Sequence, residues 1–211
     1  MKKLYKPALI SCLKASNFLY KLISYLSIRY EGGIHPKHRL IGYHDFFLDN
    51  VCSTDRVLDI GCGNGALSFD VASKVGSVLG VDIEKKNIEV ANAKFHSNKV
   101  KYIVCDATKD LTGEKFNVII LSNVLEHIDK RVDFLVSIRG LADKYLIRVP
   151  TFDRDWIPLY KKELGLEWRL DLTHFTEFTK KTFEKEVTSA GYKIESLSVQ
   201  FGEIWSVVIP N

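Results

Sequence analysis

Three glycines at every second position follow a short apolar run with one acidic residue, in the stretch RVLDIGCGNGALSF at residues 56–69. The glycines are Gly61, Gly63 and Gly65, and the acidic residue is Asp59. Glycines spaced this tightly let a backbone approach a ligand closely. The spacing also satisfies the dinucleotide fingerprint, because Ala66 can stand for its last glycine. A P-loop is excluded, since no Gly-Lys-Ser/Thr follows.

Carboxylates near this loop favour one kind of ligand. Asp59 repels a phosphate in a partly desolvated crevice and attracts a cationic amine. Asp82 ends the next predicted strand and can accept hydrogen bonds from two ribose hydroxyls, and Asp106 ends the third and can accept from an adenine amino group. A cationic amine, a carboxylate, a ribose and an adenine together describe S-adenosylmethionine. Ser122 and Asn123, at the end of the fourth strand, would contact its methionine part through backbone groups.

Other residues of these strand ends are candidates for lesser contacts with the same ligand. Cys62 belongs to the glycine loop, Cys105 and Ala107 offer backbone groups, and Ile83 can pack on the adenine ring. Asp59 has two roles that the sequence leaves open: it binds the amine directly, or it orients the loop.

Histidines supply the candidate catalytic groups. His127 follows the fourth strand and should lie near the transferred methyl, and His174 lies in the segment DLTHFT. Each is a candidate general base, and a structural role is the alternative for each. A basic cluster in residues 35–39 either binds an anionic group of an acceptor or is a solvated turn. We expect no metal site, because no His, Cys, Asp or Glu group has a coherent ligand spacing.

Alternating apolar strands and helical patterns position these residues. Strands are predicted at 56–61, 77–82, 100–106, 116–123 and 145–150, and helices at 40–51, 65–74, 84–95 and 128–142. This alternation predicts a parallel sheet covered by helices on both faces, which binds ligands at the carboxyl ends of its strands.

The chain changes character after residue 150. Residues 151–178 are rich in aromatic and charged residues without clean periodicity, which is typical of a lid or substrate-binding insert. Thr179 should cap a helix over 180–190 that Gly191 ends. Two final strands, KIESLSV and EIWSVVIP, should form an antiparallel pair.

Residues 1–30 contain no acidic residue, and their polar positions recur at helical spacing. The predicted helix either packs on the domain or lies on an anionic membrane surface or a partner. Its apolar runs fall short of the roughly 20 residues of a spanning helix, and Lys14 argues against a signal peptide. We expect this helix and a linker at 1–40, with the main domain at 41–211.

The composition of the chain restricts the class of protein to which it can belong. The chain has 211 residues, 46% apolar and 27% charged, which fits one globular domain. A net charge of +4 falls short of a dedicated nucleic-acid binder. The four cysteines show no paired spacing, so we expect buried, reduced thiols and a cytoplasmic protein that contacts the membrane at most peripherally.

Four segments in order carry a family resemblance: VLDIGCGNG, VLGVDIEKKNIEVA, YIVCDA and LSNVLEHID. Over roughly residues 55–150 the chain resembles class I S-adenosylmethionine-dependent methyltransferases of the small-molecule type. The resemblance implies a three-layer Rossmann-like α/β sandwich whose seven-stranded sheet has an antiparallel last strand. It also implies S-adenosylhomocysteine as a product and a small-molecule acceptor, with O or N methylated by in-line displacement.

Other functions stay open at this point. An NAD(P)-binding oxidoreductase would share the glycine pattern, and a catalytically silent binding module would share the fold. A nucleic-acid methyltransferase is disfavoured, because the fourth strand lacks an Asn/Asp-Pro-Pro-Tyr type segment. A protein methyltransferase remains an alternative. The sequence gives neither the acceptor nor the oligomeric state. A small molecule, such as a saccharide or a lipid-linked intermediate, is the favoured acceptor, and the basic, apolar N-terminal helix supports the lipid-linked option.

Overall fold

The computed structural model describes residues 2–33, 35–111, 113–169 and 171–211. The chain separates into two compact units, Met1–Tyr43 and His44–Asn211. The first unit holds α1 (Lys2–Tyr30) and the short α2 (Lys37–Ile41). Within it, the ring of His35 lies 3.0 Å from the Ser24 hydroxyl and ties the linker to α1. Arg39, also of the predicted basic cluster, pairs with Glu31.

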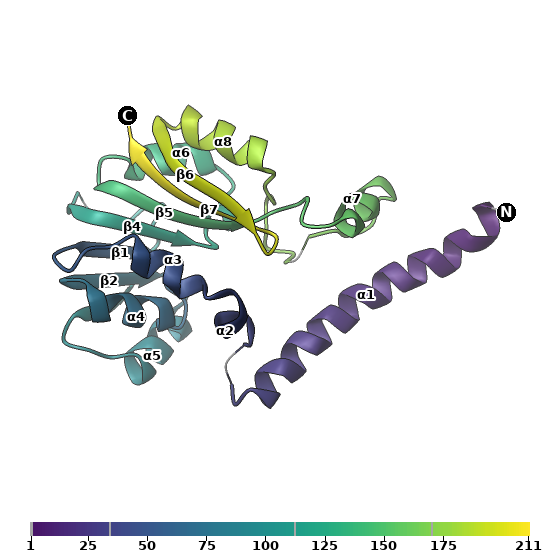
Figure 1. The fold of residues 1–211 in the computed structure, drawn as a ribbon, viewed down its shortest axis with the longest axis horizontal. Helices are drawn as coiled ribbons and strands as arrows, with labels where there is room; N and C mark the ends of the chain where they lie inside the picture. Colours follow the sequence, from purple (N-terminus) through teal and green to yellow (C-terminus); the bar gives the residue numbers. More distant parts are fainter. Residues whose placement is uncertain (1, 34, 112, 170) are drawn as a thin grey trace. The chain divides into compact units, whose positions relative to one another are not determined.

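One seven-stranded sheet organises the second unit (Figure 1), in the order β3-β2-β1-β4-β5-β7-β6. Its strands are β1 (Arg56–Ile60), β2 (Ser77–Asp82), β3 (Val100–Val104), β4 (Phe116–Ser122), β5 (Ala142–Pro150), β6 (Tyr192–Gln200) and β7 (Glu203–Pro210). The first five strands are parallel, and β7 is antiparallel to both β5 and β6. The predicted mostly parallel sheet with an antiparallel last strand is confirmed.

The other helices are α3 (Tyr43–Asp49), α4 (Ala66–Lys74), α5 (Lys85–Lys94), the 3-10 turn η1 (Leu125–His127), α6 (Arg131–Ile138), α7 (Trp156–Glu163) and α8 (Lys180–Ser189). α7 lies away from the sheet (Figure 1). α4 and α5 pack on β2 and β3, while α8 packs on β6 and against α6. Thr179 caps α8 as predicted, with its hydroxyl accepting from Thr182 N.

Two predicted helices are wrong in extent. The helix expected over 40–51 is broken at Gly42, whose left-handed φ of 53° ends α2. The helix expected over 128–142 covers only Arg131–Ile138, because Ala142 already begins β5. In a short apolar run, a buried helix and a buried strand have the same residue pattern. Periodicity therefore could not locate the boundary between α6 and β5.

The segment after β5 is more ordered than its composition indicated. It contains α7, and a parallel bridge between Thr151 and Phe178 brings its two ends together. Within this segment, Arg154 donates to the Thr151 carbonyl at 2.9 Å and pairs with the buried carboxylate of Glu177. The insert therefore returns to the sheet beside the end of β5.

The cysteine prediction is partly wrong. All four thiols are free, but Cys12 and Cys52 are exposed, Cys105 is half-buried and only Cys62 is buried. The sulfur of Cys62 packs close to Gly80 of β2, where an added Cβ would come within 3.1 Å of it.

Candidate cofactor and acceptor site

The chain order of the sheet reverses between β1 and β4, which lie side by side. Parallel sheets bind ligands in the crevice at such a switch point. The glycine loop follows β1 there, and its three glycines all have left-handed φ angles of 55° to 85°. An added Cβ at Gly61 would come within 2.7 Å of Val124, and one at Gly65 within 2.7 Å of Ala91. These two glycines are required by packing.

Backbone donors of the loop are already used inside the protein. Gly61 and Cys62 both donate to the Val81 carbonyl, at 2.7 and 3.0 Å, Gly63 donates to Asp82 Oδ2 at 2.8 Å, and Gly65 donates to the Cys62 carbonyl at 3.0 Å. A bound pyrophosphate needs such N–H groups directed toward it. The loop therefore fits a ligand that presents donors of its own better than it fits a dinucleotide phosphate.

Asp82 is the best-positioned acceptor of the crevice. Its Oδ1 accepts from Glu84 N at 2.8 Å and from the Asn87 amide at 3.2 Å, and its Oδ2 accepts from Gly63 N at 2.8 Å. These bonds fix the carboxylate plane and use both acceptor sites of Oδ1, while Oδ2 retains one. Binding of the ribose hydroxyls by Asp82 stays a prediction.

Asp59 lies beneath the loop. Its side chain is fully buried, and Oδ2 accepts from the Ser68 hydroxyl of α4 at 2.5 Å. Burial raises the pKa of Asp59 to about 7 against the opposing effect of the Ser68 bond. This contact with α4 favours the loop-orienting role over direct binding of an amine.

Replacing Asp59 with asparagine tests that burial. The folded state keeps the Asp59 proton up to about pH 7, whereas the unfolded state loses it near pH 4, so the free energy of unfolding falls as pH rises between these values. We expect Asp59→Asn to remove this pH dependence. At pH 7 its free energy of unfolding should exceed that of the wild type by roughly 2–4 kcal/mol. Urea unfolding at pH 4, 5.5 and 7 measures the difference. Asp129→Asn, at an exposed position, is the matched control. If the free energy of unfolding of Asp59→Asn exceeds that of the wild type by the same amount at all three pH values, the burial effect is contradicted.

Asp106 makes local contacts. Its Oδ1 accepts from the Thr108 backbone and hydroxyl at 3.0 and 2.6 Å, and its Oδ2 accepts from Lys109 at 2.6 Å. Lys109 and Thr108 together lower the pKa of Asp106 to about 2. The carboxylate is thus ionised within its own turn, and its contact with adenine stays a prediction.

Apolar side chains border this part of the crevice. Ile83 is 62% exposed and Val104, which the sequence reasoning missed, is 52% exposed. Exposed aliphatic groups at two adjacent strand ends suit an aromatic base. Cys105 donates its N–H to the Asp82 carbonyl at 3.0 Å, so its backbone supports the Asp82 strand end. Ala107 packs partly buried against the core beside it.

Asn123 occupies an unusual backbone position at the end of β4. Its φ is 57°, its N–H donates to the Arg148 carbonyl at 2.8 Å, and its side-chain Oδ1 is buried with no hydrogen-bond partner among the described residues. An unsatisfied buried acceptor is costly, so a ligand that donates to it is the natural explanation. Ser122 beside it lies 3.5 Å from Arg148. The strand ends thus fit S-adenosylmethionine, which donates through its amine and ribose.

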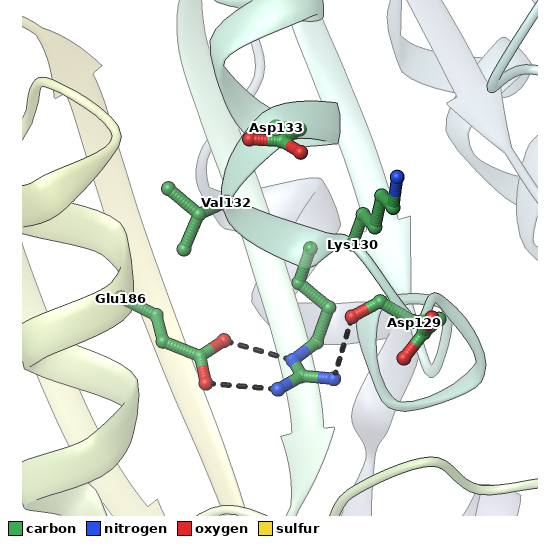
Figure 2. Close-up of a pocket in the computed structure, with 6 residues that line it drawn as sticks. Asp129, Lys130, Val132, Asp133 and Glu186 are labelled. Carbon is green, nitrogen blue, oxygen red and sulfur yellow. Dashed lines mark hydrogen bonds and ion pairs between the residues drawn. The ribbon is translucent and has the colours of Figure 1, made fainter.

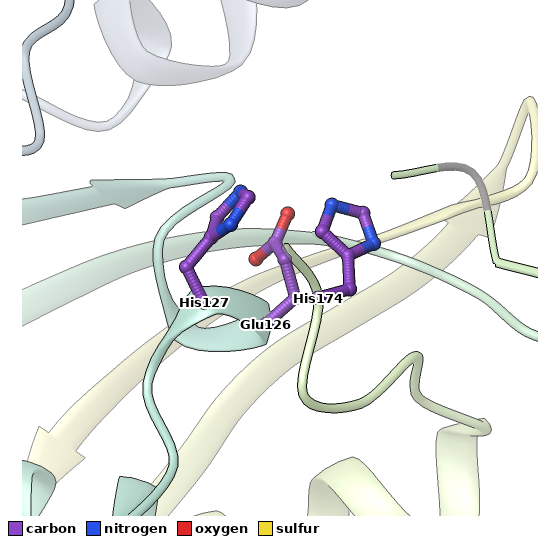
Figure 3. Close-up of side chains that lie close together, drawn as sticks. All are labelled: Glu126, His127 and His174. Carbon is purple, nitrogen blue, oxygen red and sulfur yellow. The ribbon is translucent and has the colours of Figure 1, made fainter. Parts of the chain in front are cut away.

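A second group of side chains gathers beside η1: Glu126, His127 and His174 (Figure 3). The two imidazole rings meet edge to face, with their centroids 4.6 Å apart, and the Glu126 carboxylate lies beside them (Figure 3). The insert brings His174 there, because Phe175 donates its N–H to the Glu126 carbonyl at 2.8 Å. The two predicted histidines therefore meet, and Glu126 joins them. Only the adjacency of Glu126 to His127 could have indicated it from sequence.

His127 has a defined proton position. Its Nδ1 lies 3.0 Å from the Thr173 hydroxyl, which lies 2.9 Å from Asp171 Oδ1. Because an ionised carboxylate only accepts, Thr173 donates to Asp171 and accepts from Nδ1–H of His127. The Nε2 of His127 therefore carries a lone pair. Burial, followed by His174, lowers the pKa of His127, which keeps the ring neutral.

Glu126 and His174 are buried. Burial raises the pKa of Glu126 to about 7. Nδ1 of His174 lies 3.4 Å from Glu177 Oε1, without hydrogen-bond geometry.

Open hollows lie elsewhere among the residues that the structure describes. One, of about 230 Å³, is lined by residues 129–133 and Glu186 (Figure 2), and Arg131 inside it is already held by both oxygens of Glu186 at 2.8 and 3.0 Å. Another, of about 440 Å³, lies at the amino ends of β1, β4 and β5. Neither is lined by a predicted site residue, so the strand-end crevice remains the candidate site.

Comparison with known families decides the class. Residues 52–183 match the family model described as "Methyltransferase domain". The chain belongs to this family. The methyltransferase class and the S-adenosylmethionine cofactor predicted from the motifs are confirmed with it, and the oxidoreductase alternative is set aside.

Relatives of this methyltransferase domain act on different molecules. It is 41% identical over 86 residues to ubiquinone biosynthesis O-methyltransferase from Pelagibacter ubique, covering 39% of this chain and 35% of that protein. It is 30% identical over 145 residues to ribosomal protein L11 methyltransferase from Dechloromonas aromatica, covering 64% and 48%. The chain thus spans half or less of these relatives, and they do not fix its acceptor.

The domain also shares its fold with solved structures. Magnesium protoporphyrin IX methyltransferase from Synechocystis PCC 6803, solved with bound SAH, superimposes with a TM-score of 0.65 at 19% identity, covering 81% of this chain and 84% of that one. At this identity the likeness concerns the fold, which is the one that the sequence motifs predicted.

Proposed function

We propose that this domain transfers a methyl group from S-adenosylmethionine to an oxygen or unactivated nitrogen atom of a small molecule. The cofactor supplies the activated methyl group. Asp82 holds its ribose, Asn123 accepts from its methionine end, and Ile83 with Val104 packs on its adenine. Positioning of this kind can contribute on the order of 7–11 kcal/mol of the barrier.

The observation that carries this proposal is the hydrogen-bond chain from Asp171 through Thr173 to His127. It holds a neutral imidazole with a lone pair on Nε2 immediately after the β4 strand end. Oxygen and unactivated nitrogen acceptors lose a proton on methylation and need such a group, worth about 10²–10⁴-fold in rate. His127 is the catalytic base in this proposal, and buried His174 supports it from the insert.

Transfer from labelled S-adenosylmethionine to a panel of phenols, saccharides and lipid-linked acceptors tests the function. We expect one class to give a labelled product together with S-adenosylhomocysteine. Binding of cofactor without any transfer, across acceptors of these classes and a ribosomal-protein substrate, would instead support a silent binding module.

The N-terminal helix favours an acceptor at a lipid surface. α1 combines the all-basic charge of residues 1–30 with many exposed large apolar side chains. They are Leu4, Tyr5, Phe18, Leu19, Tyr20, Leu22, Ile23, Tyr25, Leu26 and Tyr30. Within the described residues, no helix is long and apolar enough to cross a membrane. A basic helix with apolar side chains that does not span can bind anionic lipid at the interface.

Flotation with vesicles tests this placement. We expect the protein to float with vesicles that contain phosphatidylglycerol and to remain at the bottom with phosphatidylcholine alone, because lysines attract anionic headgroups. Replacing Leu19, Ile23 and Leu26 with serine should abolish flotation, while a matched triple change at exposed Lys85, Lys86 and Glu89 of α5 should not. Absence of the wild type from the anionic vesicle fraction would remove the support for a lipid-linked acceptor.

A further inference from the structure

We propose that Glu126, His127 and His174 form a binding site for one first-row divalent cation, of the type of Zn²⁺, Co²⁺ or Mn²⁺. Each residue offers one ligand atom, and the three atoms lie within 4.8 Å of one another. The spacing of these residues along the chain gave no sign of such a site. The insert creates it by placing His174 beside η1.

The first reason to place a cation here is the environment of the Glu126 carboxyl group. Its side chain is fully buried, yet neither carboxylate oxygen has a hydrogen-bond partner in the described part of the chain. A buried carboxyl group without partners loses its hydration and gains nothing in return. Buried charges in proteins are normally paired or coordinate a metal, and the free oxygens here face two imidazoles (Figure 3).

The second reason is the support around the histidines. Metal-binding histidines usually donate their other ring N–H to a carboxylate or another acceptor, which fixes the ring and its tautomer. His127 does so through Thr173 to Asp171, and His174 has Glu177 at 3.4 Å from its Nδ1. Arg154 in turn pairs with Glu177 and holds that carboxylate in place. The His127 ring is therefore arranged to present Nε2, whereas Glu177 lies near Nδ1 of His174 without a hydrogen bond to it.

Ligand chemistry selects the kind of cation. Two imidazoles and one carboxylate suit first-row transition metals and zinc better than Mg²⁺ or Ca²⁺, which prefer oxygen. Three protein ligands leave open positions, which is typical of a reactive rather than a structural site. Bonds of about 2.0–2.1 Å would bring the ligand atoms to about 3.3 Å apart, so the three side chains must draw closer when a cation binds.

This inference deepens the proposed function. It rests on that function in one respect, because the open coordination positions of the cation are taken to face the methyl acceptor. With a cation bound, Nε2 of His127 ligates the metal instead of taking the proton of the acceptor. The cation then lowers the pKa of a coordinated acceptor hydroxyl, whose proton passes to solvent.

Metal binding to the chelator-treated full chain tests the site without any need for turnover. Titration with Co²⁺, followed by visible absorption, and calorimetry with Zn²⁺ should each give one site per chain. Glu126→Gln and His174→Asn should weaken binding at least about 100-fold, and Thr173→Val, which leaves the three ligands in place, about 10- to 100-fold. His96→Asn removes an exposed histidine elsewhere and should leave the affinity unchanged.

Two results would overturn the site: no Co²⁺ spectrum with the wild type, or the same affinity in Glu126→Gln and His174→Asn as in the wild type. Circular dichroism and melting of the isosteric Glu126→Gln variant separate loss of the site from misfolding. The cation's role at the acceptor is tested separately. Turnover that survives chelation would overturn that role, whereas lack of any methyl transfer by the metal-loaded protein would count against the proposed function and leave metal binding intact.

Discussion

Asp82→Ala is expected to weaken binding of S-adenosylhomocysteine by about 100-fold or more. Two effects add in this variant. Hydrogen bonds from ribose hydroxyls to an ionised carboxylate contribute about 1.5–3 kcal/mol each, and both are lost. The Gly63 N–H also loses its acceptor at 2.8 Å, which releases the middle of the glycine loop. Isothermal titration calorimetry on the purified chain measures the change.

Glu84→Ala is the matched control, because it removes the same charge two residues further on at an exposed position. Its affinity for S-adenosylhomocysteine should stay close to that of the wild type. Asp82→Asn adds a finer comparison, since an amide still accepts at one atom and should retain part of the affinity. Unchanged affinity in Asp82→Ala would show that the cofactor does not bind at the ends of β1 and β2.

His127→Ala is expected to lower kcat about 10²- to 10⁴-fold once an acceptor is identified, while the affinity for S-adenosylhomocysteine stays unchanged. In the proposed function the imidazole lies at the acceptor side and not among the residues assigned to the cofactor. Because burial lowers the pKa of His127, the neutral ring prevails at neutral pH. Wild-type kcat should therefore rise with pH only below the ordinary histidine range and be level above it.

His96→Ala serves as the control, since His96 is exposed and belongs to no candidate site. Single-turnover measurements separate transfer from product release in both variants. Full turnover of the His127→Ala variant on the identified acceptor would end the assignment of His127 as the base, while its role as a metal ligand is decided by the metal titrations. Loss of cofactor affinity in that variant would instead show that His127 shapes the cofactor site.

The strand-end residues were predictable because a parallel sheet brings them together whatever the details of its helices. Asp59, Gly61 and Asp82 each follow or end an apolar run, and the runs became β1 and β2 with the expected bounds to within one residue. Left-handed φ angles at the glycines follow from the same turn. Local sequence therefore specified which groups border the crevice.

What each of these groups contacts was not predictable. Asp59 could have faced the ligand, yet its carboxylate bonds Ser68 on α4. The loop N–H groups could have faced a phosphate, yet they donate to Val81, Asp82 and Cys62. Directions of side chains and backbone groups depend on how β1, β2 and α4 pack, and a linear pattern carries no such information.

The sequence by itself determined the sheet, the residues at its strand ends and the family, because apolar periodicity and closely spaced motifs are local properties. Tertiary structure alone brought Glu126, His127 and His174 together. Glu126 and His174 stand far apart in the chain, and a backbone bond between Phe175 and Glu126 joins their segments. Such a long-range contact depends on the whole insert folding back beside β5, so only the folded chain reveals that two histidines share one buried, unpartnered carboxylate.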